Sequence, residues 1–459
     1  VYRQKEQPKE ETIKLPLCLK QTPIFTNASI ENRKKWPELG VEEIQLTNGI
    51  KLLVRPTLDE DSTIYLAAMG RGGTADLSPQ MQLKVHDAVS YVDMGGLAKV
   101  SCDTLLTVMT QQQLSMTVGE DAYWHQLLAS APAKKATALF DLTYEKLCFP
   151  GVNREDFAET VASELESVGK ETLLDRLLAH DPDRLMTNTI DSLVGNVAAG
   201  SEQLITKEAL QALNIDTLAN YYKRLFANPS ELTIILTGNF NAAHVVPKAI
   251  ATFAQMQVPP TPLPLNNTPF TPNKRPYSKG FEGGNDHQTV VNYIFAGNYT
   301  PSLQATLSMK LIRDVLQDRV LKVLRENENI VYSPYVDLYY NGVPQQKYHF
   351  VINLSLKNEN LQKAEILLQG ILKDLNEKPV NTAELDKLKR SFLVTKDKVL
   401  TDKTEWKTAL MSLVKNGESL YDFNDYATCL NDITPAMVQK IISEMLDWNH
   451  RMVVFKSQK

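Results

Sequence analysis

The sequence contains no long hydrophobic segment. No apolar run approaches the roughly 18 consecutive residues that a helix needs to cross a bilayer. The start of the chain also lacks the charged stretch followed by an apolar one that marks a secretory signal. Because the chain begins with Val1 rather than methionine, we expect it to be a piece of a longer protein, so the missing signal does not identify the compartment.

Cysteine and closely spaced histidine are scarce. The four cysteines lie far apart with no C-x-x-C spacing, and no two of the seven histidines fall within one helical turn of each other. These absences exclude a cysteine-rich zinc finger and a local histidine pair for a metal. We expect isolated thiols or at most one disulfide, whose pairing the sequence does not define. The chain also lacks a G-x-S-x-G segment, which argues against a serine nucleophile.

Charge of one sign is not concentrated anywhere. The net charge is −5, and the Lys and Arg residues are scattered rather than gathered on one helix or tail. This distribution does not indicate a nucleic-acid-binding surface. Hydrophobic residues make up 43% of the chain and charged residues 22%, values typical of globular proteins that bury substantial cores.

The domain organisation follows from one proline-rich stretch. Residues 256–280 hold seven prolines and almost no periodicity, which is typical of an extended linker. A chain of 459 residues is also too long for one ordinary core. We therefore predict a polar lead-in over 1–35, a first unit over 36–255, a linker over 256–279 and a second unit over 280–459.

The first unit has strand patterns followed by helix patterns. Apolar residues alternate on both sides of Asn48-Gly49, which predicts a β-hairpin with positive φ at both turn residues. A third strand is predicted over 62–70. Ser78 as an N-cap, followed by Pro79, opens a predicted helix that keeps one apolar face until Gly95. Further helices are predicted over about 133–147, 154–180, 207–213 and 216–226, before an apolar strand over 231–240.

The second unit repeats this order. A strand over 287–297 precedes a long helix from Ser302 to about Glu326. Its further predicted elements are strands over about 331–340 and 347–356, helices over 360–376 and 382–400, a helix around Trp406, a helix opened by Thr434-Pro435 and a strand over 451–457. Both units end as helix, short loop and apolar strand, which predicts two copies of one unit. Because the strands cluster in hairpins, the predicted fold class is α+β, each unit being a mostly antiparallel sheet layered against helices.

Together these segments resemble the insulinase/pitrilysin family of inverted-motif zinc peptidases, over residues 36–459. The resemblance is carried by "LTNGIKLLV", "GRGG", the helix over 78–94, "YYKRLFANPSELTIILTGNF" and, most specifically, "LRENENIVYSPY" at 324–335. It implies the pitrilysin-like metallohydrolase fold, built from homologous α+β units with two in each half. In that family the halves close around an unfolded peptide, so a chain of two units would be one half.

The helix over 78–94 indicates which half this is. The zinc half carries H-x-x-E-H, in which two histidines one turn apart bind zinc and the glutamate activates water. Aligned on that motif, His86 remains, but the glutamate position is Val89 and the second histidine position is Ser90. Glu164 or Glu166 lies where the family places its third ligand. We predict that the chain binds no metal or other cofactor, and that His86 joins Ser90 and Asp93 on the polar side of the helix.

The segment "LRENENIVYS" matches residues that the zinc-free, C-terminal half contributes to catalysis. The resemblance implies that Arg325 and Tyr332 act on the substrate, with zinc expected in a partner N-terminal half. Their chemistry is suitable, because attack on a peptide carbonyl builds negative charge that a guanidinium or a phenol can stabilise. Spacing alone has a simpler interpretation: arginine is favoured in the last turn of a helix, and tyrosine is common in strands.

The resemblance therefore implies a zinc-free half of a zinc metalloendopeptidase, inactive alone, which forms one wall of a peptide chamber. Its partners would be the N-terminal zinc-binding half, in the same polypeptide or a separate chain, and an unfolded peptide. A periplasmic or secreted location is expected from bacterial relatives. The alternative is a non-catalytic scaffold or binding subunit of the same fold, because the loss of glutamate and histidine at Val89 and Ser90 is equally compatible with it.

Overall fold

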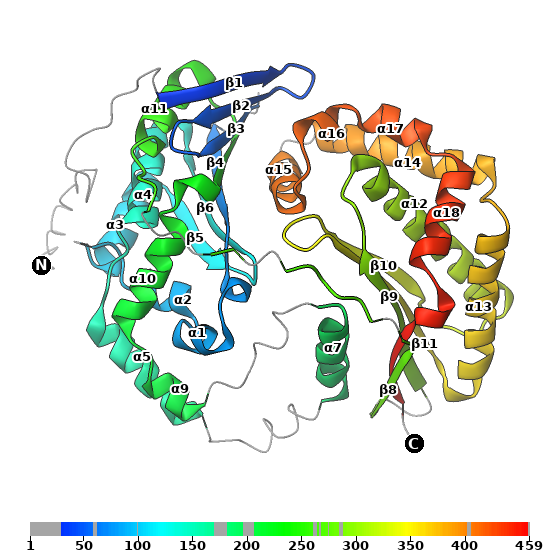
Figure 1. Ribbon diagram of the computed structural model, residues 1–459. Coiled ribbons are helices and arrows are strands. Elements are labelled where there is room, and N and C mark those ends of the chain that lie inside the picture. Colours follow the sequence, from blue (N-terminus) through cyan, green and yellow to red (C-terminus); the bar gives the residue numbers. More distant parts are fainter. Residues whose placement is uncertain are drawn as a thin grey trace, which may run out of the picture. The chain divides into compact units, whose positions relative to one another are not determined.

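The computed structural model describes residues 29–57, 62–98, 100–168, 181–195, 206–259, 264–265, 268–273, 275–283, 288–401 and 405–457. The chain divides into two compact units (Figure 1). Unit 1 comprises Val1–Leu165 and Lys207–Leu265, and unit 2 comprises Glu166–Thr206 and Asn266–Lys459. Each unit contains one sheet.

The sheet of unit 1 has seven strands in the order β1-β2-β3-β7-β4-β6-β5. Neighbouring strands are antiparallel, except that β3 and β7 are parallel. The central strands are the most apolar, and Leu66 and Leu236 are fully buried. The strands are β1 (Ile30–Trp36), β2 (Val41–Leu46), β3 (Lys51–Pro56), β4 (Thr63–Arg71), β5 (Ser115–Glu120), β6 (Trp124–Pro132) and β7 (Leu232–Gly238).

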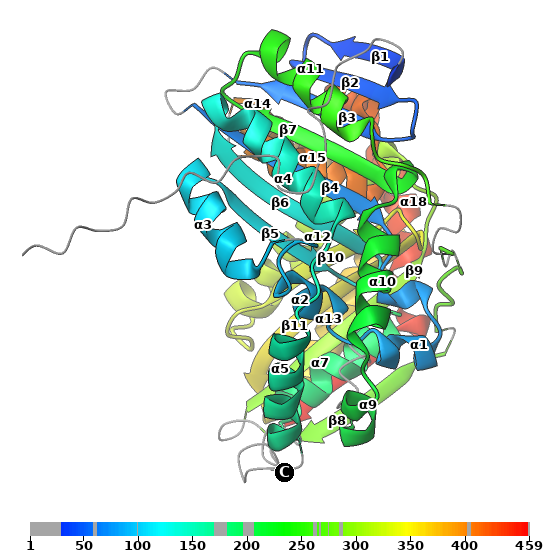
Figure 2. The ribbon, with the colours of Figure 1, turned by 90° about the vertical axis from the view of Figure 1, so that its left-hand side faces the viewer.

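Helices α4, α10 and α11 lie side by side over one face of this sheet (Figure 2). Asn214 caps α10 by accepting hydrogen bonds from the amides of Asp216 and Thr217. The apolar residues of α10 then recur at helical spacing and are buried against the unit. The helices of unit 1 are α1 (Pro79–Lys84), α2 (Ala88–Asp93), α3 (Cys102–Gln112), α4 (Ala136–Cys148), α5 (Arg154–Ser167), α9 (Lys207–Gln211), α10 (Ile215–Phe226) and α11 (Ala242–Phe253).

Two details at the start of unit 1 differ from the sequence prediction. Of the two hairpin turn residues, Gly49 alone has positive φ, at 97°. Asn48 instead donates its side-chain amide to the carbonyls of Phe253 and Met256, at 2.9 and 3.0 Å. The predicted lead-in over 1–35 also overlaps β1, which lacks an apolar alternation and is joined to β2 by the Arg33–Glu42 ion pair at 2.8 Å. The predictions for residues 1–28 and for a helix over 169–180 lie outside the described residues.

The sheet of unit 2 has five strands in the order β10-β11-β9-β12-β8. Its neighbours are antiparallel, except that β12 and β8 are parallel. The strands are β8 (Tyr277–Glu282), β9 (Gln288–Asn298), β10 (Tyr335–Asn341), β11 (Lys347–Lys357) and β12 (Met452–Ser457). β8 begins inside the predicted linker, because its main chain pairs with β12 although its sequence is polar.

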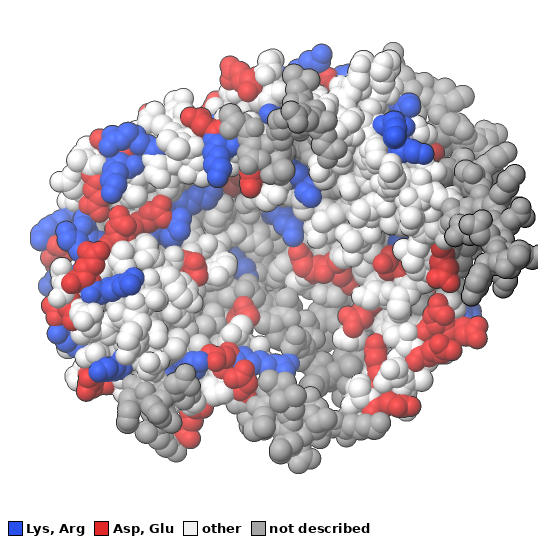
Figure 3. Space-filling view, turned by 180° about the vertical axis from the view of Figure 1, so that it is seen from behind, with Lys and Arg blue, Asp and Glu red and all other residues white. Residues whose placement is uncertain are grey.

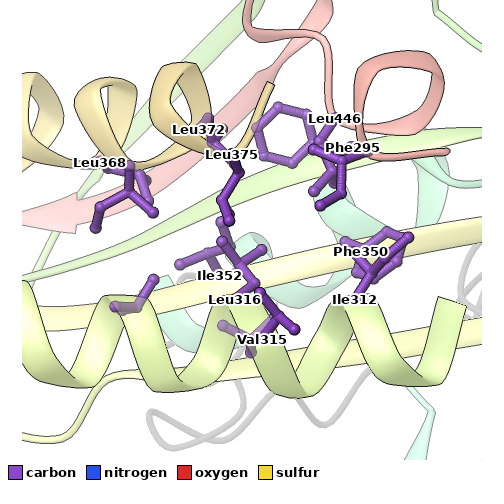
Figure 4. Packing of buried hydrophobic residues seen from close by; sticks show 14 of the residues in the cluster. Phe295, Ile312, Val315, Leu316, Phe350, Ile352, Leu368, Leu372, Leu375 and Leu446 are labelled. Carbon is purple, nitrogen blue, oxygen red and sulfur yellow. The ribbon is translucent and has the colours of Figure 1, made fainter. Parts of the chain in front are cut away.

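One face of this sheet packs on α12, α13 and α18, which form the main core of the unit. Figure 4 shows Ile352 of β11 lying between Leu316 of α12 and Leu372 of α13, with Phe350 of the same strand beside Ile312, and all five are at most 1% exposed. The helices are α7 (Pro182–Leu193), α12 (Leu303–Val320), α13 (Leu361–Glu377), α14 (Thr382–Thr401), α15 (Glu405–Asn416), α16 (Leu420–Asn424), α17 (Tyr426–Asp432) and α18 (Pro435–Met445). Ser302 caps α12 and Thr434 caps α18.

The two units repeat one topology. The strand order β3-β7-β4-β6-β5 of unit 1 corresponds to β8-β12-β9-β11-β10 of unit 2, with the same pair parallel in both. In each unit a helix and a short loop lead into an interior strand of the sheet, β7 after α10 in unit 1 and β12 after α18 in unit 2, and in unit 1 helix α11 follows. The predicted α+β class and pitrilysin-like fold are therefore confirmed.

Helix α7 departs from the continuous first unit predicted over 36–255. It packs on the second face of the unit 2 sheet, where Met186 and Val194 contact Ile294, Val351 and Val454. The Lys347 ammonium donates to the carbonyls of Val194 and Gly195 at the carboxyl end of α7, at 3.1 and 2.7 Å. These are tertiary contacts, so no local sequence pattern could assign α7 to unit 2.

The described surface carries both signs of charge. On the face drawn in Figure 3, basic and acidic side chains are interspersed with uncharged residues. Among the described residues, no helix has both the length and the apolar character to cross a membrane.

Candidate functional site

The two candidate catalytic residues flank a turn at the end of α12. The helix continues into a π-helical turn over Leu321–Asn327, which contains Arg325. Such wide turns are rare and recur at functional sites. Two residues beyond the π-helical turn, Asn329 has φ of 50°. Asparagine tolerates this left-handed conformation better than most residues do. The amide of Ile330 then donates to the carbonyl of Leu324 at 3.0 Å.

Buried residues on both sides anchor this turn. Leu324 is fully buried, and Ile330 and Val331 are 8% and 4% exposed. Val331 forms a bridge with Leu356, and the amide of Tyr332 donates to the carbonyl of Ser355 at 2.9 Å. The main chain of Tyr332 is therefore fixed to β11.

Arg325 and Tyr332 themselves point outward. Arg325 is exposed, and Tyr332 is 47% exposed although its neighbour Val331 is buried. Lys363 of α13 forms an ion pair with Glu328 of the turn at 2.6 Å, and Gln317 of α12 donates to Pro334 O and accepts from Val336 N. Two exposed polar side chains are thus carried by a main chain whose neighbours are buried and hydrogen-bonded.

The helix predicted over 78–94 is broken in two, which corrects the prediction for His86. Ser78 caps the first part as expected, but α1 ends at Lys84 and α2 begins at Ala88. Asp87 lies between them with φ of 49° and ψ of 26°. His86 therefore precedes α2 and does not share a helical face with Ser90 and Asp93.

His86 is paired with its neighbour. Its Nε2 lies 3.1 Å from a carboxylate oxygen of Asp87, and this hydrogen bond raises the pKa of His86 and lowers the pKa of Asp87. Glu164 of α5 is near enough to raise the pKa of His86 further.

Glu164 is engaged by a residue that the sequence analysis did not single out. The Tyr91 hydroxyl donates to Glu164 at 2.5 Å, and its ring meets Phe157 edge to face at 5.3 Å. Burial, and then the bond to Glu164, raise the pKa of Tyr91. Tyr91 is 3% exposed, and a buried tyrosine hydroxyl usually requires a hydrogen-bond partner. The sequence alone offered only the position of Tyr91 in the apolar part of the segment.

These side chains do not fit a zinc site. Val89 is 5% exposed and offers only hydrocarbon, Ser90 is exposed, and Glu164 is bonded to Tyr91. Zinc sites of this kind need two imidazoles on one continuous helix, and here the helix is interrupted between His86 and Ser90. Within the described ranges, no cluster of three or more His, Cys, Asp or Glu residues is arranged to hold a metal ion.

Lys146 of α4 contacts the carboxyl end of α2. Its ammonium forms an ion pair with Asp93 at 2.6 Å and donates to the carbonyls of Asp93 and Gly96, at 3.2 and 3.3 Å. Lys146 is buried, at 3% exposure, whereas the Asp93 side chain is 48% exposed. The cation lies at the carboxyl end of the helix, where the helix dipole favours it. Sequence spacing could not reveal a contact across 53 residues.

Comparisons with known proteins support the resemblance to the insulinase/pitrilysin family. Residues 212–392 match the family model described as Peptidase M16 inactive domain. A protein of Arabidopsis thaliana named zinc protease PQQL-like is 22% identical over 337 residues, which are 69% of this chain and 31% of that protein. The fold is similar to the periplasmic protease PqqL of Escherichia coli, with a TM-score of 0.79 at 14% identity over 99% of this chain and 49% of that one.

Pitrilysin is also similar in fold, with a TM-score of 0.68 and 12% identity over 96% of this chain and 46% of that chain. The chain spans about half or less of the length of these three proteins. The family match lies across the end of unit 1 and much of unit 2, and the structural matches extend over nearly the whole chain. Residues 212–392 therefore match the inactive domain of the M16 peptidases, and nearly the whole chain shares the fold of PqqL and pitrilysin, which supports the resemblance to the zinc-free, C-terminal half of the insulinase/pitrilysin family.

Proposed function

We propose that this chain is the non-zinc half of a zinc metalloendopeptidase, in which it forms one wall of the peptide chamber and contributes Arg325 and Tyr332 to peptide-bond hydrolysis. The observation that carries the proposal is the anchored turn that holds both side chains at the surface. The partner would be the N-terminal half, in the same polypeptide or a separate chain. A zinc ion bound in that half would activate the attacking water.

The two side chains suit the charge that develops in this reaction. When water attacks a peptide carbonyl, the carbonyl oxygen gains negative charge, and a phenol or a guanidinium held in place stabilises it more than it stabilises the substrate. The backbone bond of Tyr332 to Ser355 and the buried neighbours of Arg325 limit how far each can move. Such preorganised donors reduce the reorganisation that the reaction requires.

The name of the similar PqqL protein describes it as periplasmic. We propose a periplasmic or secreted location for the protein to which this chain belongs.

The test is reconstitution with the N-terminal half. We expect the chain alone to cleave no unfolded peptide and the combined halves to cleave it. Tyr332→Phe should then lower kcat by about 10²–10³ with little change in peptide affinity, because it removes one donor to the transition state. The measurement is the initial rate of cleavage of a quenched fluorescent peptide.

Tyr335→Phe is the matched control, because Tyr335 is 46% exposed, close to the 47% of Tyr332, and lies three residues away. Arg325→Ala is compared in the same way with Lys322→Ala on the same turn. Equal rates for the two tyrosine variants would remove Tyr332 from the mechanism. A reconstituted pair that binds peptide without cleaving it would instead support a scaffold or binding subunit.

A further inference from the structure

The sheet of unit 2 lacks two strands that unit 1 has. Sheet 1 continues beyond β3 with β2 and β1, whereas the described part of sheet 2 stops at β8. β8 is the counterpart of β3, because each pairs in parallel with an equivalent interior strand, β12 for β8 and β7 for β3. In unit 1 the outer edge of β3 is covered by β2, which runs antiparallel to it.

Among the described residues, no strand pairs with the outer edge of β8. The amide of Tyr277 donates to the carbonyl of Arg451, and the amide of Gly283 donates to that of Ser457, both at 3.2 Å. Alternate residues of a strand face opposite edges, so the intervening Ser278 and Gly280 direct their N–H and C=O groups away from β12. Both residues are exposed, and no described strand pairs with this side. Such an edge can accept another strand.

A pocket opens beside this edge, on the face of the sheet covered by α13. It has a volume of about 230 Å³ and is lined by Val291, Val453, Phe455, Leu361 and the ion pair between Arg451 and Glu365, among others. Its apolar wall suits an aliphatic side chain. The pocket is large enough to accept one such side chain.

The two outward residues of β8 leave this pocket open toward the edge. Ser278 lines the pocket, and the side-chain position of Gly280 faces the Phe455 ring, where an added Cβ would come within 2.5 Å of a ring carbon. A residue larger than glycine would displace that ring. Beside the pocket, β8 therefore presents the hydroxymethyl group of Ser278 and the hydrogen of Gly280, and the exposed Glu282 follows on the same face at the end of the strand.

The other face of β8 carries a cation. The Lys279 ammonium lies 4.9 Å from the centre of the Phe281 ring. A lysine on an edge strand disfavours pairing between two copies of that strand. It favours an acidic residue on an incoming strand, because opposite charges on neighbouring strands attract.

Unit 1 indicates which occupant fits the equivalent place. There β2 places the fully buried Ile44 opposite Leu52 and carries Glu42 and Glu43. Helix α11 also covers this corner, since Asn48 of the hairpin bonds to its end. The outward-facing main-chain groups of Ser278 and Gly280 select a strand over a helix, because a helix satisfies its own main-chain hydrogen bonds.

We propose that the edge of β8 binds an extended peptide segment of another polypeptide, antiparallel to β8, with an aliphatic side chain in the pocket and an acidic residue near Lys279. This site is separate from the turn that holds Arg325 and Tyr332 and lies on the opposite edge of the sheet from β10. Its occupation requires neither the zinc half nor catalysis.

The experiment uses the full chain and a fluorescent peptide with the sequence of residues 40–47, which contains the strand that fills the equivalent place in unit 1. Binding is measured by fluorescence anisotropy, and protection of Ser278 and Gly280 by amide hydrogen exchange. We expect saturable binding, protection at both amides, and weaker binding of the same peptide carrying Ile44→Thr.

Two variants of one residue separate strand pairing from other contacts. Ser278→Pro removes an outward N–H, which an edge strand tolerates, whereas Ser278→Ala keeps it. We expect the proline variant to bind the peptide about tenfold more weakly than the alanine variant, the effect of losing one hydrogen bond of about 1.4 kcal/mol. Leu361→Trp should fill the pocket and so reduce the difference in affinity between the peptide with Ile44 and the peptide with Ile44→Thr.

Equal affinities of Ser278→Pro and Ser278→Ala would overturn the proposal, as would no binding at millimolar peptide. Sedimentation gives a further check. A dimer of the chain that Ser278→Pro dissociates would mean that a second copy occupies the edge, which also overturns it. Peptide binding at β8 is measured without cleavage. Failure of the reconstituted halves to cleave a peptide would therefore not affect this proposal, and the two proposals can fail independently.

Discussion

At the scale of the residue, the segment over 78–94 differs from a zinc-binding H-x-x-E-H helix in more than the two side chains at Val89 and Ser90. His86 stands before α2, Asp87 has a left-handed conformation, and Tyr91 bonds to Glu164. A hydrocarbon at Val89 is also buried, so a carboxylate there would lose hydration without gaining a partner. The local structure has adapted to the absence of metal ligands.

We therefore expect the double variant Val89→Glu with Ser90→His to hold no stoichiometric zinc. The interrupted helix keeps His86 out of register with position 90, so the restored residues cannot act as one H-x-x-E-H turn. The measurement is zinc content by atomic absorption after dialysis, with the unaltered chain as control. One tightly bound zinc per double-variant chain would show that the interruption is not decisive.

A second residue-scale prediction concerns Glu120 of β5. Burial raises the pKa of Glu120 to about 7, although the hydrogen bond from the Tyr221 hydroxyl, at 2.9 Å, opposes this rise. Because the folded form holds the proton more tightly than the unfolded one, the stabilising contribution is fully present below pH of about 4.5 and is lost as the pH rises through about 7.

Glu120→Gln should remove this dependence, since glutamine does not ionise and can still accept from Tyr221. We expect the free energy of unfolding of the unaltered chain to fall by on the order of 2 kcal/mol more than that of the variant between pH 5 and pH 8. Urea unfolding at both pH values measures this, with the exposed Glu155→Gln as control. Parallel pH profiles for the unaltered chain and Glu120→Gln would contradict it.

At the scale of the element, secondary structure followed from local pattern where capping and periodicity agreed. Ser302 and Thr434 cap α12 and α18 as expected, and the long helix buries Leu307, Leu311 and Val315. The elements that were missed depend on distant partners. β1 is held by main-chain pairing with β2, to which the Arg33–Glu42 ion pair adds, and β8 is held by the main chain of β12. No window of sequence around either strand contains that information.

Helix α7 is an element whose attachment can be tested. Lys347 is 5% exposed, burial lowers its pKa to about 8, and its ammonium bonds to the last carbonyls of α7. We expect Lys347→Met to remove both hydrogen bonds and to speed amide exchange in Pro182–Leu193 by about 10- to 100-fold, as losing bonds to a charged donor costs about 1.5–3 kcal/mol.

Lys357→Met is the control for that experiment, because Lys357 lies on the same strand but is exposed at its end. Exchange is followed by mass spectrometry of peptides from α7. If α7 exchanges equally slowly in both variants, the apolar contacts of Met186 and Val194 hold it without help from Lys347.

At the scale of the whole molecule, the presence of two copies of one unit was predictable. The unequal number of strands in the two described sheets and the placement of α7 in unit 2 were not. The repeated ending of helix, loop and apolar strand indicated two copies, and the strand orders agree. For the candidate site, the segment around Arg325 and Tyr332 could be located from sequence, but the π-helical turn and the backbone bond to Ser355 could not. Their positions arise from packing of α12 and β11, which belong to different parts of the chain.

The position of α7 in the chain has a consequence for synthesis on the ribosome. Its docking surface includes Met452 and Val454 of β12, roughly 260 residues later. At a translation rate of about 5–20 residues per second, roughly 13 to 52 seconds separate their emergence. During that interval the apolar side of a newly made α7 has no finished sheet to cover it, so the nascent polypeptide exposes a transient binding surface for chaperones.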